Sequence, residues 1–353
     1  MGPLTATGWL SSPSTGDAVW ARAEEPSSAA GMRRHAARLA ARLGFGAERM
    51  GRIQIAVTEA ATNLAKHAVR GEMLVRVVRA GDDAALEVLC LDHGPGMGDV
   101  PGSRLDGHST TGTLGIGLGA IERLADHSGV HSLPHAGTVL FARFLRGRGE
   151  GAAAATPPRL PFAGLTRPIE GEEECGDAFV ARMEGGTIYA MLCDGLGHGP
   201  MAARAAAEAV AAVRDATLPA GPADLLAQVH RRLGSTRGGA VSVAAVDPGG
   251  GVVRFAGLGN VAGWILGPER RQGMVSVPGI AGAQARRLRE HVYELPPGAA
   301  VVLHSDGLTG RWDAAGRPDL GRDPLLLAAD LLREAGVRHD DRGVLAVTTA
   351  GWR

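Results

Sequence analysis

Apolar positions in the first half of the chain follow helix-type patterns at first and then change to short β-prone runs bounded by turn residues. This order, helices followed by antiparallel-type strands, predicts an α+β sandwich. The expected elements are two helices, two strands, a further helix and a final strand. They cover, in chain order, Ser27 or Ser28 to about Leu43, Ala47–Ala68, Val75–Val78, Leu86–Leu91, Leu118–His127 and Thr138–Phe144.

Apolar runs in the second half predict many short strands interrupted by paired helices, which is typical of a β-sandwich with helical layers. The expected strands are Asp177–Met183, Ile188–Cys193, Ala240–Val246, Val252–Ala256, Ala262–Leu266, Val275–Val277, Val292–Leu295, Ala300–His304 and Val344–Thr348. The expected helices are Met201–Arg214, Ala223–Leu233 and Pro324–Glu334.

A boundary between the two halves is visible at Arg146–Pro161, where glycine, alanine and proline dominate and no amphipathic period appears. At 353 residues the chain is also longer than one hydrophobic core usually supports, so two domains are expected. We predict a poorly ordered lead or short edge element over residues 1–25, a first domain over 26–146, a linker over 147–160 and a second domain over 161–353.

The composition narrows the class of protein. Lys plus Arg and Asp plus Glu both number 37, and this balance argues against a nucleic-acid or anionic-membrane binder. The three cysteines, Cys90, Cys175 and Cys193, lack metal-type spacing, and their odd number favours reduced thiols. No apolar run has the length of a membrane span, and the N-terminus lacks signal-peptide features. We therefore expect a cytoplasmic, soluble protein.

The sequence Asp194-Gly195-Leu196-Gly197-His198-Gly199 places a carboxylate at the end of a buried strand, followed at once by glycines. Acidic residues recur in similar settings at Asp177, Asp306 and the pair Asp340-Asp341. Several carboxylates cannot converge in a core without a cation, because unpaired buried charge is too costly. All-oxygen ligation suits Mg²⁺ or Mn²⁺. The second half is thus expected to hold a hard-metal hydrolytic site.

A second set of candidate catalytic and ligand-binding residues lies in the first half of the chain. Glu59 and Asn63 are four apart on one helix face, where an acid and an amide can orient a metal-bound water or a hydroxyl nucleophile. Asp92-His93-Gly94-Pro95-Gly96 follows a strand, and the glycine-rich run Gly112–Gly119 opens a helix. Glycines at a helix N-terminus expose N–H groups that bind phosphate.

This ordered set resembles the Bergerat-type (GHKL) ATP fold, and the stretch Val57–Ala68 is similar to its serine-kinase and anti-sigma branch. The resemblance covers about residues 26–145 and implies ATP with Mg²⁺ in an α/β sandwich. It implies Mg²⁺ on Asn63, the adenine amino group on Asp92 and Thr138, and Glu59 as the base that activates a target serine. The implied nucleotide-binding residues are Asn63, Asp92, Gly94, Gly96, Gly115, Gly117 and Thr138, with Gly115 and Gly117 on phosphate.

The acidic motifs of the second half follow the order of the metal-dependent PPM (PP2C-like) phosphatases and resemble the SpoIIE/RsbX branch. This resemblance covers about residues 159–349. It implies a PP2C-like αββα sandwich with a dinuclear Mn²⁺ or Mg²⁺ centre, in which Asp194 takes part in the hydrolysis by metal-activated water. Asp341 competes with Asp340 as the last ligand, and both alternatives stay open. The implied metal ligands are Asp177, Asp194, the carbonyl of Gly195, Asp306 and Asp340.

The two resemblances together imply a partner-switching regulator of sigma-factor or stress signalling. A serine/threonine phosphatase would remove phosphate from a STAS-domain anti-sigma antagonist or stressosome protein, and a kinase-like domain would add it. Alternatively, the first half is a non-catalytic ATP-sensing module that binds a sigma factor or antagonist. Hydrolysis of a small phosphorylated metabolite is a third reading. A homodimer is compatible with the anti-sigma resemblance; no nucleic-acid or membrane partner is expected.

Overall fold

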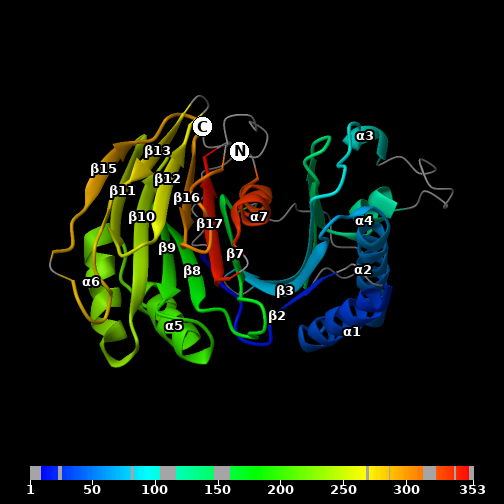
Figure 1. Cartoon of the computed structure of the whole chain (residues 1–353), viewed down its shortest axis with the longest axis horizontal. Coiled ribbons are helices and arrows are strands. Elements are labelled where there is room, and N and C mark those ends of the chain that lie inside the picture. Colours follow the sequence, from blue (N-terminus) through cyan, green and yellow to red (C-terminus); the bar gives the residue numbers. More distant parts are fainter. Residues whose placement is uncertain are drawn as a thin grey trace. The chain divides into compact units, whose positions relative to one another are not determined.

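The computed structural model describes residues 9–22, 26–80, 83–103, 117–146, 160–267, 270–285, 287–312, 323–337 and 339–349. Contacts divide the chain into two compact units. One unit lies within Pro13–Pro157, and the other combines the segment before Pro13 with Pro158–Arg353. Figure 1 follows both units from the N-terminus in blue to the C-terminus in red.

The first unit is an α/β sandwich built on one antiparallel sheet (Figure 1). Strand β2 pairs with β3, and the order continues through β4 and β6 to β5. Alternate strand residues such as Val75 and Val88 pack against helix residues such as Ile53 and Val57 to form its hydrophobic core. The elements are β2 (Ala18–Arg22), α1 (Pro26–Arg42), α2 (Ala47–His67), β3 (Glu72–Ala80), β4 (Asp83–Asp92), α3 (Val100–Ser103), α4 (Gly117–Leu124), β5 (His127–Ser132) and β6 (Thr138–Leu145).

The second unit is an αββα sandwich. One sheet has the order β14-β11-β10-β9-β8-β1, with β15 also on β11, and the other has the order β13-β12-β16-β17-β7. Helices α5 and α6 cover the first sheet, and α7 covers the second. The strands are β1 (Trp9–Ser11), β7 (Phe162–Arg167), β8 (Asp177–Glu184), β9 (Thr187–Gly195), β10 (Gly239–Asp247), β11 (Val252–Leu258), β12 (Ala262–Leu266), β13 (Arg271–Met274), β14 (Ser276–Val277), β15 (His291–Glu294), β16 (Ala300–His304) and β17 (Arg342–Thr348). The helices are α5 (Pro200–Arg214), α6 (Pro222–Arg232), the short 3-10 turn Leu233–Ser235 and α7 (Pro324–Ala335).

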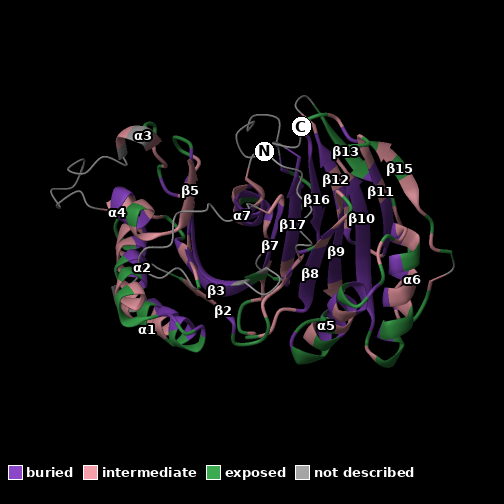
Figure 2. Cartoon of the chain, turned by 180° about the vertical axis from the view of Figure 1, so that it is seen from behind, coloured by how far each residue is buried: buried purple, intermediate pink, exposed green. Residues whose placement is uncertain are grey.

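Alternation along the strands sorts the side chains of the second unit by face. Cys193 and Val180 pack in the core under α5 and α6. Asp194, the next residue after Cys193, therefore points to the opposite face of its sheet, toward the second sheet. Figure 2 shows central strands such as β9, β10 and β16 as almost continuously buried, and the outer faces of α5 and α6 as exposed. The carboxylates of this unit thus sit at the edge of a closed apolar interior.

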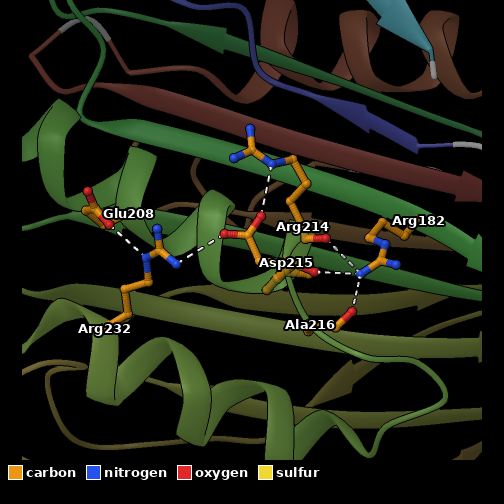
Figure 3. Close-up of polar contacts among 7 residues, drawn as sticks. Arg182, Glu208, Arg214, Asp215, Ala216 and Arg232 are labelled. Carbon is orange, nitrogen blue, oxygen red and sulfur yellow. Dashed lines mark hydrogen bonds and ion pairs between the residues drawn. The ribbon is translucent and has the colours of Figure 1, made fainter. Parts of the chain in front are cut away.

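Polar contacts hold helices α5 and α6 in place at the end remote from Asp194 (Figure 3). The Arg232 guanidinium on α6 donates to Glu208 on α5 at 2.8 Å and to Asp215 at 3.2 Å. The Arg182 guanidinium, on β8, donates to the backbone carbonyls of Val213, Arg214 and Ala216 at 2.7–3.0 Å. These carbonyls belong to the C-terminal end of α5, where they have no partner within the helix.

The predicted elements match the structure in most places, and the differences have physical reasons. The helix expected over Leu118–His127 ends at Leu124, because the Asp126 N–H bonds to the Arg143 carbonyl and its carboxylate accepts from the Leu145 N–H at 2.7 Å. His127 instead begins β5, whose polar sequence gives no strand signal. Strands β7 and β13 were not predicted either. The first directly follows the proline-rich stretch and the second is a polar, exposed edge.

The lead segment contains short edge elements, one of the two alternatives predicted for it. Trp9–Ser11 forms β1 on the edge of β8, in register with Val180–Arg182, and Ala18–Arg22 forms β2 on β3. The lead therefore supplies one edge strand to each unit. Runs of three and five residues are too short to show a period, and their pairing partners lie far away in the sequence.

No helix in the described part of the chain is long and apolar enough to cross a membrane.

Candidate active sites

Asp177 and Asp194 face each other across neighbouring antiparallel strands at one end of the second unit. They are register partners, Asp177 opening β8 and Asp194 standing near the end of β9. The Gly195 N–H donates to the Gly176 carbonyl at 3.0 Å, which closes the strand pair beside them. Two side chains at directly opposed positions lie only about 5 Å apart at Cβ. The pairing thus forces two carboxylates into one small space.

Two further aspartates come to the same place from the second sheet. Asp306 follows the end of β16 and Asp340 precedes the start of β17, and these two strands pair with each other. Burial, the charge of Asp306 and a hydrogen bond with Asp306 raise the pKa of Asp194 to about 8. Burial and the same Asp306 carboxylate also raise the pKa of Asp340. Asp306 thus lies between Asp194 and Asp340, and the Asn260 amide donates to it from the β11–β12 turn.

Asp177 is more deeply buried than its partner. Burial first, and then the charge of Asp194, raises its pKa well above the usual range for an aspartate. The Ser305 hydroxyl donates to Asp177 Oδ2 at 2.6 Å and accepts from the Gly343 N–H at 2.9 Å. Ser305 therefore connects the strand ends of the two sheets. A Cβ on Gly343 would stand 3.0 Å from Asp177 Oδ2, so a side chain there would press on this carboxylate.

The structure gives Asp341 a different environment from Asp340. One Asp341 carboxylate oxygen accepts from the Ile169 N–H at 2.7 Å, and the other accepts from the Gly176 N–H at 2.8 Å. Asp341 therefore fixes the loop that leads into β8. The Asp340 carboxylate accepts the N–H of Asp341 at 2.9 Å and faces Asp306.

Neither cysteine near this site is prepared for nucleophilic catalysis. Burial and nearby aspartates raise the pKa of the Cys175 and Cys193 thiols well above their usual range. A thiol of that kind stays protonated near neutral pH, and the thiolate is the reactive form. His198 Nδ1 lies 2.9 Å from Glu172 Oε1 at the outer edge of the site. The chemistry is therefore left to the aspartates.

The candidate nucleotide site of the first unit starts from α2. Glu59 and Asn63 lie on it four residues apart, both half-buried. A Cβ on Gly117, the first residue of α4, would stand 3.1 Å from Asn63 Nδ2 and 3.2 Å from Asn63 Oδ1. Asn63 thus lies against the helix start that the glycine run leads into. Gly115 lies outside the described residues.

The expected adenine-binding residues come together on the sheet. Asp92, the last residue of β4, is the register partner of Thr138, the first residue of β6. Thr138 Oγ1 lies 2.9 Å from Ser132 Oγ, and Ser132 also accepts from the Met97 N–H at 2.8 Å. Sequence reasoning missed Ser132, because β5 itself gave no strand signal.

Two glycines shape the loop after Asp92. The Gly94 N–H donates to Asp92 Oδ1 at 2.7 Å, and a Cβ on Gly94 would meet the His67 carbonyl at 2.7 Å. Gly96 has φ +65°, and a Cβ there would stand 1.9 Å from the Leu133 carbonyl oxygen. Both positions thus need glycine, because backbone passes where a side chain would be.

Comparisons with known proteins agree with this geometry. The family model "Histidine kinase-like ATPase domain" matches residues 22–144, and the model "Stage II sporulation protein E (SpoIIE)" matches residues 184–348. The serine/threonine-protein kinase RsbT of Bacillus subtilis (strain 168) is 35% identical over 104 residues, which are 30% of this chain and 78% of RsbT. The chain belongs to the fusions of a Bergerat-fold, anti-sigma kinase-like ATPase domain with a SpoIIE-type PPM phosphatase domain.

Two solved structures are similar as well. One, described as the bacterial stressosome, a modular system adapted to control secondary messenger signaling, has a TM-score of 0.48 and 31% identity. The match covers 54% of this chain and 99% of the chain in that structure. The other is the crystal structure of RsbX in complex with magnesium, with a TM-score of 0.47 and 18% identity, covering 52% of this chain and 92% of its own.

This membership makes the chain a regulator of partner-switching architecture, with a kinase-like ATPase domain and a metal-dependent serine/threonine phosphatase domain. In the described residues, no three His, Cys, Asp or Glu side chains are already gathered as a ligand set. The donor chemistry of the phosphatase domain nevertheless fits hard divalent cations. Aspartates from both sheets meet there, and burial together with the neighbouring carboxylates raises the pKa of Asp177, Asp194 and Asp340. Carboxylate oxygens are the ligands that these cations prefer.

Proposed function

We propose that the phosphatase domain hydrolyses phosphoserine or phosphothreonine esters on a protein, with Mn²⁺ or Mg²⁺ bound in a dinuclear centre. The observation that carries this proposal is the cross-strand pair Asp177–Asp194, with Asp306 brought against it from the other sheet. When bound, divalent cations lower the pKa of water and neutralise phosphoryl oxygens during in-line attack. The proposed ligands are Asp177, Asp194, the Gly195 carbonyl, Asp306 and Asp340.

The surrounding residues have positioning roles in this proposal. Ser305 donates to Asp177 Oδ2 and so holds this carboxylate in one orientation. Asn260 fixes the rotamer of Asp306, and Asp341 fixes the loop that begins β8. Asp341 is thereby assigned to loop structure, and Asp340 is assigned to the metal.

For the ATPase domain we propose ATP binding with Mg²⁺ and transfer of phosphate to a protein serine. Asn63 would hold Mg²⁺, and Asp92 with Thr138 would bind the adenine amino group. Gly94 and Gly96 would shape the base pocket, and Gly115 and Gly117 would contact phosphate. Glu59, one helical turn from Asn63, would accept the proton of the target hydroxyl. The relation to the kinase RsbT supports this assignment.

The proposed substrate of both domains is a STAS-domain anti-sigma antagonist or a stressosome protein in the cytoplasm, and a sigma factor is a candidate binding partner. The two opposing reactions on one serine would set the output of a partner-switching pathway. A dimer of the ATPase domain is compatible with this scheme. The protein partner is proposed from the RsbT relation, and the reaction chemistry is proposed from the site.

Incubation of the full chain with a phosphorylated STAS protein, with and without Mn²⁺, tests the phosphatase. We expect release of phosphate that depends on Mn²⁺ and is lost in Asp194→Ala. Asp215→Ala is the matched control, because Asp215 is exposed at the far end of α5. Activity that persists in Asp194→Ala, or that needs no divalent cation, would contradict the proposal.

A further inference from the structure

Arg237 is an exposed cation beside the metal-site loop of the phosphatase domain. Its Nη1 lies 3.5 Å from the place where a Cβ on Gly197 would stand, within the sequence that begins with Asp194. In the described part of the chain, no acidic side chain forms an ion pair with Arg237. At the same loop, His198 Nδ1 lies within hydrogen-bond distance of Glu172 Oε1, at 2.9 Å. Among the described residues, Arg237 is thus a positive charge without an ion-pair partner at the edge of an acidic centre.

Backbone contacts fix the position of Arg237. The Leu196 N–H donates to the Gly238 carbonyl at 3.0 Å, so the metal-site loop and the Arg237 loop are joined directly. The Gly238 N–H donates to Thr236 Oγ1 at 3.0 Å, and this hydroxyl donates to the Leu233 carbonyl at 2.8 Å. Gly239, two residues after Arg237, is the register partner of Gly195. Arg237 therefore stays at the same end of the sheet as Asp194.

Two large apolar side chains are exposed on the same loop. Leu196 is 50% exposed and Met201, the second residue of α5, is 46% exposed. They flank the segment from Gly197 to Pro200 on both sides. An exposed apolar side chain alone is ordinary. Here two of them border a loop that leads to the proposed reaction centre, and the neighbouring loop places the Arg237 guanidinium beside it.

We propose that Arg237, Leu196 and Met201 form the surface that receives the phosphorylated segment of a protein substrate. Arg237 binds the phosphoryl oxygens, since a guanidinium matches their charge and geometry. Leu196 and Met201 contact apolar side chains next to the phosphoserine or phosphothreonine. This inference rests on the proposed phosphatase function and assigns its substrate class: a protein segment and not a small metabolite.

Steady-state kinetics with Mn²⁺ on two substrates tests the phosphoryl contact. The substrates are p-nitrophenyl phosphate, which has no flanking residues, and phosphorylated casein. We expect Arg237→Gln to raise KM for both about tenfold, the loss typical of one charge-assisted contact. It should weaken inhibition by inorganic phosphate by a similar factor, while kcat changes less. The KM values of Arg237→Lys should lie between those of the wild type and of Arg237→Gln, because lysine keeps the positive charge but cannot donate two parallel hydrogen bonds as a guanidinium does.

Arg214→Gln is the matched charge control. Arg214 is the last residue of α5, so its backbone lies about 20 Å along the helix from Gly199. If the wild-type protein releases phosphate but Arg237→Gln and Arg214→Gln have equal KM values and equal inhibition by phosphate, the Arg237 assignment is wrong. A wild-type protein that hydrolyses neither substrate would instead overturn the proposed phosphatase function itself.

The apolar contacts are tested by Leu196→Ala and Met201→Ala, with Val292→Ala as control, since Val292 is 66% exposed on the edge strand β15. We expect kcat/KM for phosphorylated casein to fall several-fold more than kcat/KM for p-nitrophenyl phosphate in the first two variants. Equal changes on both substrates, or changes no larger than in Val292→Ala, would overturn the docking role and favour a small-metabolite substrate.

Discussion

Asp177 and Asp194 are opposed register partners in the folded phosphatase domain. Burial and then the charge of Asp194 raise the pKa of Asp177, and Asp194 itself has a pKa of about 8, with burial as the main cause. An unfolded chain gives aspartate a pKa of about 3.9. The folded protein therefore binds protons that the unfolded chain has released between about pH 4 and pH 8. The two strands pair despite this electrostatic cost, because the apolar residues beside the aspartates are buried.

The difference in proton binding between the folded and unfolded states gives a first prediction. Since the folded state binds more protons, the free energy of unfolding of the metal-free phosphatase domain falls as pH rises from about 5 to 8. Asp194→Asn should make the free energy of unfolding depend less on pH. Mn²⁺ should reduce the loss of stability at high pH, because the cation neutralises the carboxylates. Thermal unfolding of the full chain at several pH values, with EDTA or Mn²⁺, measures it. A metal-free wild type whose stability rises across this window would contradict the prediction.

Ser305 offers a second prediction, because its hydroxyl bonds to Asp177 and to the Gly343 N–H at once. Ser305→Ala removes the donor to a buried carboxylate, and we expect a loss of about 1–3 kcal/mol in stability. Affinity for Mn²⁺, measured by calorimetry, should also fall, since Asp177 loses its orientation. Ser242→Ala is the control: Ser242 is equally buried in β10, yet its Oγ has no hydrogen-bond partner among the described residues. Equal effects of the two substitutions would refute the positioning role.

Most of the candidate site could be predicted from the sequence because its residues stand at the ends of recognisable strands. Asp194 and Asp306 follow apolar runs and precede glycine, so both the strand and its end are visible locally. The role of Ser305 could not be predicted, since its partner Asp177 lies 128 positions away and only the packing of two sheets brings them together. Arg237 gives no signal either, because a lone arginine in a loop has no distinctive pattern.

The fold shows the same division between local and distant information. Strands such as β9 and β10 are apolar throughout and were located to within a few residues. β5 and β13 were missed because their sequences are polar and only pairing with β6 and β12 makes them strands. Glu87 within Leu86–Leu91 was visible as an acid in an apolar run, but the two arginines that compensate it come from β3 and β6.

Those arginines give a third prediction. Glu87 is fully buried and bonded to Arg76 Nε at 2.8 Å and to Arg143 Nε at 2.9 Å. Burial alone raises its pKa, but the two guanidinium charges outweigh burial and lower it. The resulting stability is present above the unfolded pKa of about 4.3 and is lost as pH falls through the folded pKa.

We expect Glu87→Gln to destabilise the ATPase domain by about 3–5 kcal/mol, because the buried Arg76 and the partly buried Arg143 each lose an ion pair with Glu87. Hydrogen–deuterium exchange of peptides from β3 and β4 in the full chain measures this locally. A triple variant, Arg76→Met with Glu87→Leu and Arg143→Met, is the control and should recover much of the loss. If Glu87→Gln leaves exchange unchanged, the ion pairs contribute nothing to the stability of the sheet.

The last prediction separates phosphate transfer from nucleotide sensing in the ATPase domain. Glu59 and Asn63 share one face of α2, and Asn63 lies against Gly117, the first residue of α4. We expect Asn63→Ala to weaken Mg²⁺-dependent ATP binding at least tenfold, since it removes a proposed metal ligand at the phosphates. Glu59→Gln should leave ATP binding within about twofold and reduce phosphorylation of a STAS protein by about 10²-fold or more, the contribution of a general base. Calorimetry measures ATP binding, and a radiolabelled ATP assay measures phosphorylation.

The exposed Glu48 in the first turn of α2 provides the matched control, Glu48→Gln, which should change neither ATP binding nor phosphorylation. Phosphorylation that survives in Glu59→Gln would reject Glu59 as the base. A wild-type protein that binds ATP but phosphorylates no STAS protein would instead favour an ATP-sensing module that binds its partner without transferring phosphate.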